Sequence, residues 1–171
     1  MSLDKNRLFE FLEEIDKELD FEITLVAVGG TALTLLDVKP STIDIDFTVP
    51  NYFEEFRDFL LTLSHGFKID LYHDSMVFTQ ILPEDYLKKS KLIKTPQLKK
   101  ISLRSLDPID IVVTKIGRLN DRDKQDIDIC IKNFRLKKAD IIKRANSVEH
   151  ADSEDNYQAN LQIVLNTLFR M

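Results

Sequence analysis

The first part of the chain alternates between helix-like and strand-like patterns of apolar residues. In residues 4–19, apolar side chains recur every three or four positions among charged ones, which predicts an amphipathic helix packed on a core. Residues 21–28 form an apolar run that predicts a strand. Gly29-Gly30 interrupts this run. The pattern of residues 31–36 predicts a short helix, which is followed by a turn at Lys39-Pro40.

The clearest strand pattern covers residues 43–49. Apolar side chains at positions 43, 45 and 47 alternate with Asp44, Asp46 and Thr48. This alternation predicts a half-buried strand that has one acidic side. Because apolar residues flank both aspartates, we expect the strand to lie well inside the sheet.

A helix is expected after Pro50, which ends this strand. Asn51 is a suitable N-cap, and apolar residues between 53 and 63 form one helical stripe. His65-Gly66 would close the helix. Two strands, residues 67–72 and 76–82, are then expected to pair as a hairpin around residues 73–75.

The second half of the sequence is mostly helical in pattern. Short strands are expected near residues 91–94 and 99–103, and a helix is expected to begin with Asp107 as N-cap and Pro108 in its first turn. The remaining helices are expected near residues 121–133, 137–148 and 153–169.

This order of elements predicts an α+β (mixed α/β) fold, in which an α/β part over residues 1–105 precedes a helical half over residues 106–171. No Gly/Ser-rich or Pro-rich linker separates the two parts, so we expect residues 1–171 to form a single domain. No apolar run is long enough for a membrane span, and the N-terminus lacks a secretory apolar segment. We therefore expect a cytoplasmic protein with no membrane partner. Cys130 is the only cysteine, which excludes an intramolecular disulfide, and we expect it to be a small buried apolar residue.

Charge is distributed unevenly along the chain, whose net charge is −5. Residues 1–86 carry 18 acidic and 6 basic side chains, whereas residues 87–171 carry 11 acidic and 18 basic ones. Residues 88–104 contain seven basic residues and no acidic one, a composition that would attract a phosphate-bearing ligand. The alternative is a solvated surface that balances the acidic half. This stretch also lacks the aromatic residues expected of a platform for single-stranded nucleic acid.

The candidate chemistry lies between residues 28 and 49. Gly29 and Gly30 stand between a strand and a helix, where backbone N–H groups can approach a phosphate closely. Asp44 and Asp46 are two residues apart on a strand, so both carboxylates project to the same side and can share Mg²⁺ or Mn²⁺. The alternative is the wet side of an edge strand. Aspartate is a poor strand former, however, and two like charges on one side repel each other, so the pattern favours a cation site.

These residues resemble the signature of the nucleotidyltransferase superfamily related to DNA polymerase beta. The matching runs are G-G-T-A-L and, after about a dozen residues, T-I-D-I-D-F. The chain is particularly similar to minimal prokaryotic members, including the nucleotidyltransferase-like toxins of abortive-infection and toxin–antitoxin systems. The resemblance implies a third carboxylate on a later strand, here Asp70 in K-I-D-L-Y, with Asp74 and Asp85 as nearby competitors. It makes residues 1–105 the catalytic core.

The resemblance also implies a metal-dependent transfer of a nucleoside monophosphate from a nucleoside triphosphate to a hydroxyl acceptor. Asp44 and Asp46 would hold both cations, and Asp70 would hold the one at the attacking hydroxyl. Four residues would contact the triphosphate: Gly29, Gly30, Thr31 and Thr42. The acceptor, whether RNA, protein or small molecule, is not defined by the sequence.

Other residues allow two interpretations. Lys115, Arg118 and Arg122 recur at helical spacing and would face the triphosphate together, or they would form an exposed helix face paired with Asp121, Asp123 and Asp126. His65 and His73 lie in turns and are expected to be surface residues. Two rival functions remain: a catalytically idle nucleotidyltransferase-like fold that acts as a binding or toxin–antitoxin module, and an interaction protein whose terminal helices pair with a partner or a second copy.

Overall fold

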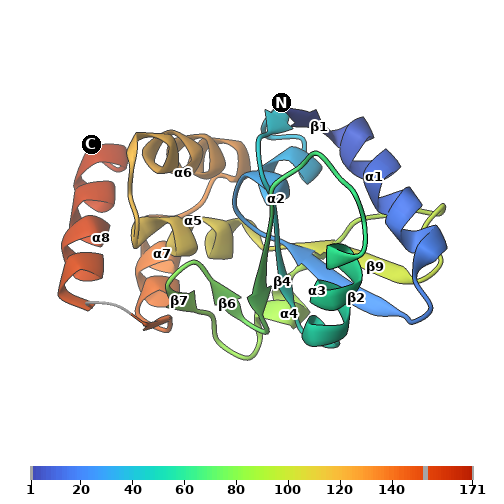
Figure 1. The fold of residues 1–171 in the computed structure, drawn as a ribbon. Coiled ribbons are helices and arrows are strands. Elements are labelled where there is room, and N and C mark those ends of the chain that lie inside the picture. The colour runs from blue at the N-terminus through green and yellow to red at the C-terminus, as the bar shows by residue number, and fades with distance from the viewer. Residues whose placement is uncertain (1, 152–153, 171) are drawn as a thin grey trace.

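The computed structural model describes residues 2–151 and 154–170, and it confirms the α+β fold class (Figure 1). A mixed sheet with helices α1, α2 and α3 forms one part of the molecule, and helices α5 to α8 gather beside it (Figure 1). The N-terminal half supplies α1 (Lys5–Glu18), α2 (Gly29–Leu35), α3 (Phe53–Leu61) and the short α4 (Tyr86–Lys89). The C-terminal half supplies α5 (Pro108–Ile116), α6 (Asp121–Phe134), α7 (Lys138–Ala145) and α8 (Glu154–Leu168).

The main sheet has five strands in the order β5-β4-β2-β9-β8. They are β2 (Ile23–Ala27), β4 (Ile45–Val49), β5 (Ile69–His73), β8 (Lys91–Leu92) and β9 (Ile101–Ser105). The central pair β2 and β4 is antiparallel, whereas β4 pairs with β5 and β2 pairs with β9 in parallel. Every residue of β4 is buried, so this strand lies inside the sheet as expected but is not half-buried.

Two small sheets complete the fold. One pairs β1 (Leu3–Asp4) with β3 (Ser41–Thr42). The other joins β6 (Met76–Val77), β7 (Gln80–Ile81) and β10 (Glu149–His150). The expected hairpin between residues 67–72 and 76–82 is therefore wrong, because β5 pairs with β4, and β6 pairs with β7. The second sheet attaches the β6–β7 hairpin to the chain between α7 and α8.

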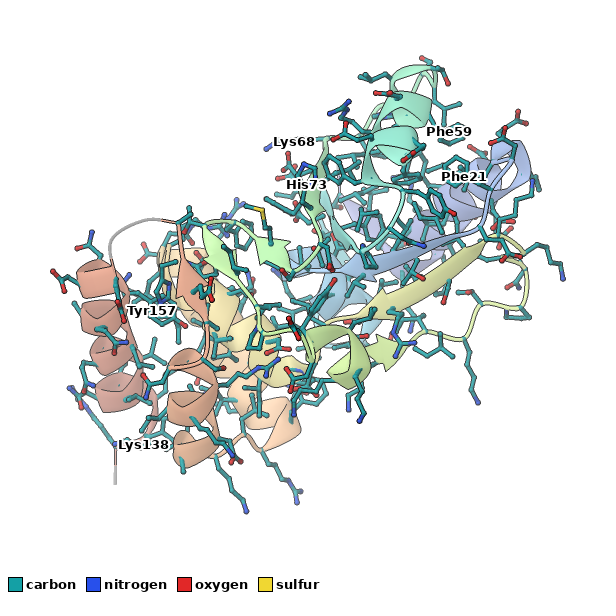
Figure 2. The ribbon with its side chains drawn as sticks, turned by 90° about the horizontal axis from the view of Figure 1, so that it is seen from below. Phe21, Phe59, Lys68, His73, Lys138 and Tyr157 are labelled. Atoms are coloured by element: carbon teal, nitrogen blue, oxygen red, sulfur yellow. The ribbon has the colours of Figure 1, made fainter. Side chains whose placement is uncertain are left out.

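The local sequence explains several helix starts. Asp107 accepts a hydrogen bond from the backbone N–H of Ile109 at 3.0 Å, and Pro108 opens α5, as predicted. Asn120 and Asp123 form a reciprocal capping box at the start of α6. Among the C-terminal helices, the buried Tyr157 of α8 donates its hydroxyl to the carbonyl of Val113 at 2.7 Å (Figure 2). This hydrogen bond fixes α8 against α5.

Four expectations about element boundaries are wrong. Asn51 does not cap α3: its side chain accepts a hydrogen bond from the Thr24 N–H, and the left-handed Tyr52 precedes the helix. Ile43 lies outside β4 with 53% of its surface exposed, because β4 begins at Ile45. The expected strand 76–82 is divided into β6 and β7, which are joined through Phe78 with a positive φ of 54°. The expected helix 137–148 ends at Ala145, and the chain then enters β10.

The last predicted helix agrees with α8, although its expected first residue, Ser153, lies outside the described residues. Cys130 is buried, as predicted. Across the described part of the chain, no helix combines the length and apolar character needed to cross a bilayer.

Candidate active site

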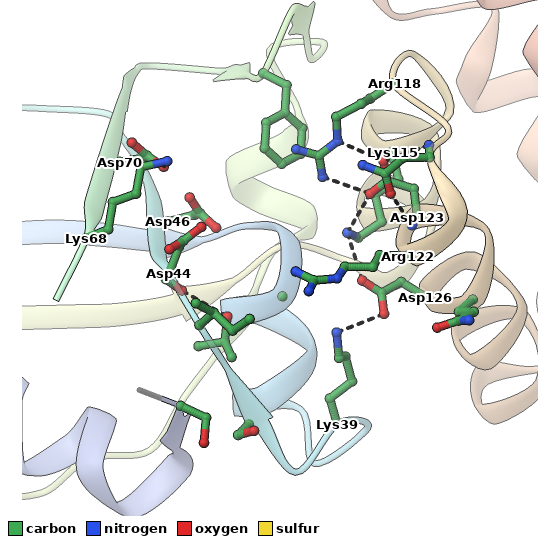
Figure 3. A pocket seen from close by; sticks show the side chains of 18 of the residues that line it. Lys39, Asp44, Asp46, Lys68, Asp70, Lys115, Arg118, Arg122, Asp123 and Asp126 are labelled. Carbon is green, nitrogen blue, oxygen red and sulfur yellow. Dashed lines mark hydrogen bonds and ion pairs between the residues drawn. The ribbon is translucent and has the colours of Figure 1, made fainter.

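A pocket of about 790 Å³ lies between the sheet and the helices α5 and α6. Acidic side chains outnumber basic ones on one side, and basic side chains outnumber acidic ones on the other (Figure 3). We call Asp44, Asp46 and Asp70 the acidic face of the pocket. The opposite side, here called the basic face, contains the side chains of Lys39, Lys115, Arg118 and Arg122.

Strand pairing produces the acidic face. Asp46 of β4 and Asp70 of β5 occupy matching positions in the parallel register, so they are direct neighbours across the two strands. Asp44 stands immediately before β4, two residues from Asp46, and therefore projects toward the same side. Three carboxylates from two strands thus line one pocket.

Asp46 is buried and has two negatively charged neighbours. The residue is only 8% exposed, and its burial, together with the charges of Asp70 and Asp44, raises the pKa of its carboxyl to about 7. Lys115 and Lys68 oppose this effect. Lys68 forms an ion pair with Asp70 at 3.2 Å, and both side chains are partly or largely exposed. The acidic face therefore holds more negative charge than its neighbours compensate.

Two buried threonines hold the acidic strand in place. Thr31 of α2 donates its hydroxyl to the carbonyl of Asp44 at 3.1 Å and accepts the N–H of Asp46 at 3.0 Å. The Thr42 hydroxyl donates to the same Asp44 carbonyl at 2.9 Å. Because Thr31 is fully buried and does not line the pocket, its hydroxyl fixes the backbone that carries the acids and has no access to a ligand. Thr42 does line the pocket.

The glycine pair allows α2 to begin directly beside the acids. Gly29 has a φ of +56°, a conformation that costs glycine little, and a Cβ there would lie 3.5 Å from the Asp46 Oδ2 atom. A Cβ on Gly30 would lie only 3.0 Å from the Thr42 hydroxyl oxygen. Gly30 lines the pocket and Gly29 lies just behind it.

Buried ion pairs organise the basic face. Lys115 of α5 is 2% exposed and contacts the carboxylates of Asp123 at 3.2 Å and Asp126 at 3.0 Å. Lys39 reaches Asp126 at 3.0 Å from the loop after α2. Arg118 binds Asp123 through two nitrogens. The pairing with Asp123 and Asp126 agrees with one of the two interpretations of these residues, but Lys115 is buried at the pocket rather than exposed on a helix face.

The pocket brings together most of the predicted site residues: Asp44, Asp46, Asp70, Gly30, Thr42 and Lys115. The two competitors of Asp70 lie elsewhere. Asp74 accepts a hydrogen bond from the Tyr86 hydroxyl, and Asp85 pairs with Arg144. The basic stretch 88–104 does not contribute to the pocket lining. Within it, Lys89 forms an ion pair with Asp85, and Lys91 forms one with Asp107.

The histidines also lie outside this lining. His73 stacks on Phe53 with ring centroids 3.7 Å apart. The Nδ1 atom of His65 lies 2.9 Å from the Phe67 carbonyl oxygen. His73 is exposed as predicted, whereas His65 is partly buried beside Phe11.

The pocket residues that were not anticipated from the sequence include Lys39, Lys68, Tyr72 and Phe78. Lys68 and Tyr72 stand two positions on either side of Asp70, so strand alternation contained the signal that would have placed them on its side. Nothing in the local sequence indicates that Lys39 or Phe78 reaches the pocket, because long-range packing brings both of them there.

The acidic face suits a divalent cation by its chemistry. Within residues 2–151 and 154–170, no group of three or more His, Cys, Asp or Glu side chains is arranged to hold a metal ion. The donor set is nevertheless entirely carboxylate oxygen, which Mg²⁺ and Mn²⁺ prefer. The raised pKa of Asp46 is the second feature that fits a cation, because a cation would offset both the burial and the repulsion that raise this pKa.

Comparison with known proteins assigns the chain to a family. Neither the curated proteins nor the solved structures that were compared with the chain gave a match. One family matches residues 6–165, a range that contains α1 except its first residue, α2 to α7, all strands of the main sheet and both faces of the pocket. That family is described as a nucleotidyltransferase of unknown function (DUF6036). The chain therefore belongs to this nucleotidyltransferase family.

Proposed function

We propose that this protein transfers a nucleoside monophosphate from a nucleoside triphosphate to a hydroxyl acceptor in the pocket between β4, β5 and α6. The observation that carries the proposal is the polarity of the pocket, whose acidic face stands opposite a basic face. A nucleoside triphosphate bound with divalent cations presents both charges: the cations suit carboxylates, and the phosphates suit lysine and arginine.

The acidic face is the proposed cation site. Asp44, Asp46 and Asp70 would hold Mg²⁺ or Mn²⁺, and Asp70 would exchange its ion pair with Lys68 for the cation. When bound, the cations neutralise charge on the phosphates and lower the proton affinity of the acceptor hydroxyl.

The protein residues then have separate tasks. Arg122, together with N–H groups of the basic face that are not bound to Asp123 or Asp126, binds the phosphates. Gly30 allows the phosphates to approach the start of α2. Asp70 is more exposed than Asp46, so it faces the acceptor and takes up the hydroxyl proton. The acceptor oxygen forms a bond to the α-phosphorus as the bond from that phosphorus to the β-phosphate oxygen breaks, and pyrophosphate leaves.

A catalytically idle binding module is the second candidate, and one observation favours it. The acids are not gathered around a metal position in the described residues, and Lys68 already neutralises part of the charge of Asp70. An idle module would bind neither cation nor triphosphate at this pocket.

Labelled nucleotides test the proposal directly. The protein is incubated with each of the four ribonucleoside triphosphates, labelled on either the α- or the γ-phosphate, with Mg²⁺ or Mn²⁺ and with the RNA, protein and small-molecule fractions of a cell extract. Transfer of a nucleoside monophosphate moves the α-label and not the γ-label to an acceptor.

Two matched variants control this assay. Asp46→Asn is expected to abolish transfer of the α-label. Asp58→Asn makes the same chemical change at an exposed position of α3 and is expected to behave as the unmodified protein. Transfer of the γ-label would indicate a phosphotransferase instead, and α-transfer that survives in Asp46→Asn would remove Asp46 from the mechanism.

A further inference from the structure

The guanidinium of Arg118 is held in one plane by Asp123. Its Nε atom donates to Asp123 Oδ2 at 2.7 Å and its Nη2 atom donates to Oδ1 at 2.8 Å. Asp123 is fully buried and is also fixed by Lys115 and by the N–H of Asn120. Two parallel hydrogen bonds to an immobile carboxylate fix the orientation of the guanidinium plane.

Phe78 covers one side of this plane. The central carbon of the guanidinium lies 4.3 Å from the centroid of the Phe78 ring. Tyr72 contacts the same ring in an edge-on arrangement, with centroids 5.7 Å apart. Phe78 stands between β6 and β7 with a φ of 54°, a conformation that is costly for a bulky residue and is often found at functional sites. The turn is thus shaped to place an aromatic ring behind Arg118.

Phe78 and Asp123 leave part of the Arg118 side chain open to the pocket. The Arg118 side chain is 47% exposed although its carboxylate partner is buried, and the residue lines the pocket together with Phe78 and Tyr72. Two of the five guanidinium N–H groups are bound to Asp123. What remains for a ligand is a flat, charged, preoriented surface and the other N–H groups at its edge.

We propose that the open part of Arg118 stacks on the nucleobase of the bound triphosphate. This inference rests on the proposed function and adds the position of the base. A nucleobase is planar and has a π-face, which is the shape and electronic character that a guanidinium plane binds well. Because all four bases offer such a face, Arg118 contributes affinity with little discrimination among them.

Calorimetry separates stacking from simple charge attraction. The ligands are inorganic tripolyphosphate and four ribonucleoside triphosphates with a methylene group between the α- and β-phosphorus, which blocks transfer; all are measured with Mg²⁺. Arg118→Lys keeps the positive charge and removes the plane. It is expected to weaken binding of every nucleotide about tenfold and to leave tripolyphosphate binding within about twofold.

Two further variants guard against a fold defect. Phe78→Leu leaves Arg118 and Asp123 paired and removes the ring behind them, so nucleotide binding is expected to weaken by about threefold, again without an effect on tripolyphosphate. Arg57→Lys makes the same exchange on the exposed side of α3 and is expected to bind all ligands normally.

The outcomes distinguish this inference from the proposed function. Equal losses for nucleotides and tripolyphosphate in Arg118→Lys would show that Arg118 acts by charge alone, and unchanged binding of both would show that it contacts neither; either result overturns the stacking role. If the unmodified protein binds tripolyphosphate no less tightly than the nucleotides, the base gains nothing from stacking and the inference fails while the basic face stands. If it binds neither ligand, the proposed function itself fails and takes the inference with it.

Discussion

The hydroxyl of Thr31 accepts a hydrogen bond from the backbone N–H of Asp46 and donates one to the carbonyl of Asp44. One buried side chain of α2 thereby fixes the backbone on both sides of Ile45. The distance between the two carboxylates consequently depends on a residue that does not touch the pocket.

Thr31→Val tests this dependence. Valine keeps the shape of threonine but leaves the buried N–H of Asp46 unsatisfied, which costs about 1 to 3 kcal/mol of unfolding free energy. We also expect Mn²⁺ affinity to fall by about tenfold, because the carboxylates lose their fixed spacing. Thr31→Ser keeps the hydroxyl and is expected to retain most of the affinity. Normal Mn²⁺ binding by a folded Thr31→Val protein would rule out the positioning role.

Asp46 is expected to make the metal-free protein less stable as pH rises. Its folded-state pKa of about 7 exceeds the ordinary value of 3.8, so between these values the folded chain binds more protons than the unfolded chain. The destabilisation develops between about pH 4 and pH 7 and is then complete. Asp46→Asn removes this destabilisation. The free energy of unfolding of the variant, relative to that of the unmodified protein, should therefore increase by on the order of 2 kcal/mol as pH rises from 4.5 to 8.

Urea unfolding in the presence of a chelator measures this difference. Saturating Mg²⁺ should stabilise the unmodified protein at pH 8 and reduce the advantage of the variant. A stability difference that does not change with pH would show that the carboxylate is not perturbed.

Asp16 is expected to have the opposite pH dependence. Burial disfavours its charged form, but hydrogen bonds from the N–H groups of Lys99, Lys100 and Ile101 outweigh burial, so the pKa of Asp16 is lowered. The contribution of Asp16 to the free energy of unfolding is therefore complete above the ordinary pKa of 3.8. It is lost as pH falls through the lower folded-state pKa. Asp16→Asn should cost about 2 kcal/mol at pH 7 and less at pH 3.

The exposed Asp20 provides the comparison for Asp16. Asp20→Asn is expected to change the free energy of unfolding by less than about 0.5 kcal/mol. Both variants should bind Mn²⁺ normally, since neither residue lies near the pocket. An equal effect of the two substitutions would contradict the role of the three hydrogen bonds.

Lys115 is expected to matter for stability because it neutralises two buried acids. Lys115→Met leaves Asp123 with Arg118 and Asp126 with Lys39 as their remaining partners, and we expect a loss of about 3 kcal/mol. Adding Asp126→Asn removes one of the uncompensated charges. The double variant should therefore unfold at higher urea concentration than Lys115→Met alone; an equal or lower midpoint would argue against charge imbalance as the cause.

The sequence alone predicted features that depend on residues close together in the chain. The alternation around Asp44 and Asp46 located the acidic strand, and the pair Asp107-Pro108 located the start of α5. The choice of Asp70 followed from the resemblance to nucleotidyltransferases. Its position opposite Asp46 did not, because the register of β4 on β5 depends on packing between strands that are separated by α3.

The features that were missed depend on long-range contacts. β1, β3 and β10 have two residues each, which is too short for a periodic pattern, and the break between β6 and β7 was not expected. Residues 149–150 form a strand because they pair with β7. The roles of Phe78 and Lys39 likewise arise only when the hairpin and the loop after α2 meet the helices. Thr31 was expected to contact substrate, and only the structure places its hydroxyl against the backbone of the acidic strand.

We expect the acidic face to bind divalent cations for a nucleoside triphosphate on the basic face. Electron paramagnetic resonance of Mn²⁺, titrated with protein and with a nontransferable triphosphate, measures this binding directly. The free Mn²⁺ signal should be lost with the unmodified protein and with Asp58→Asn, binding should be tighter when the triphosphate is present, and Asp46→Asn should show no specific binding. Free Mn²⁺ that persists with the unmodified protein and triphosphate, or equal binding by Asp46→Asn, would rule out the cation site.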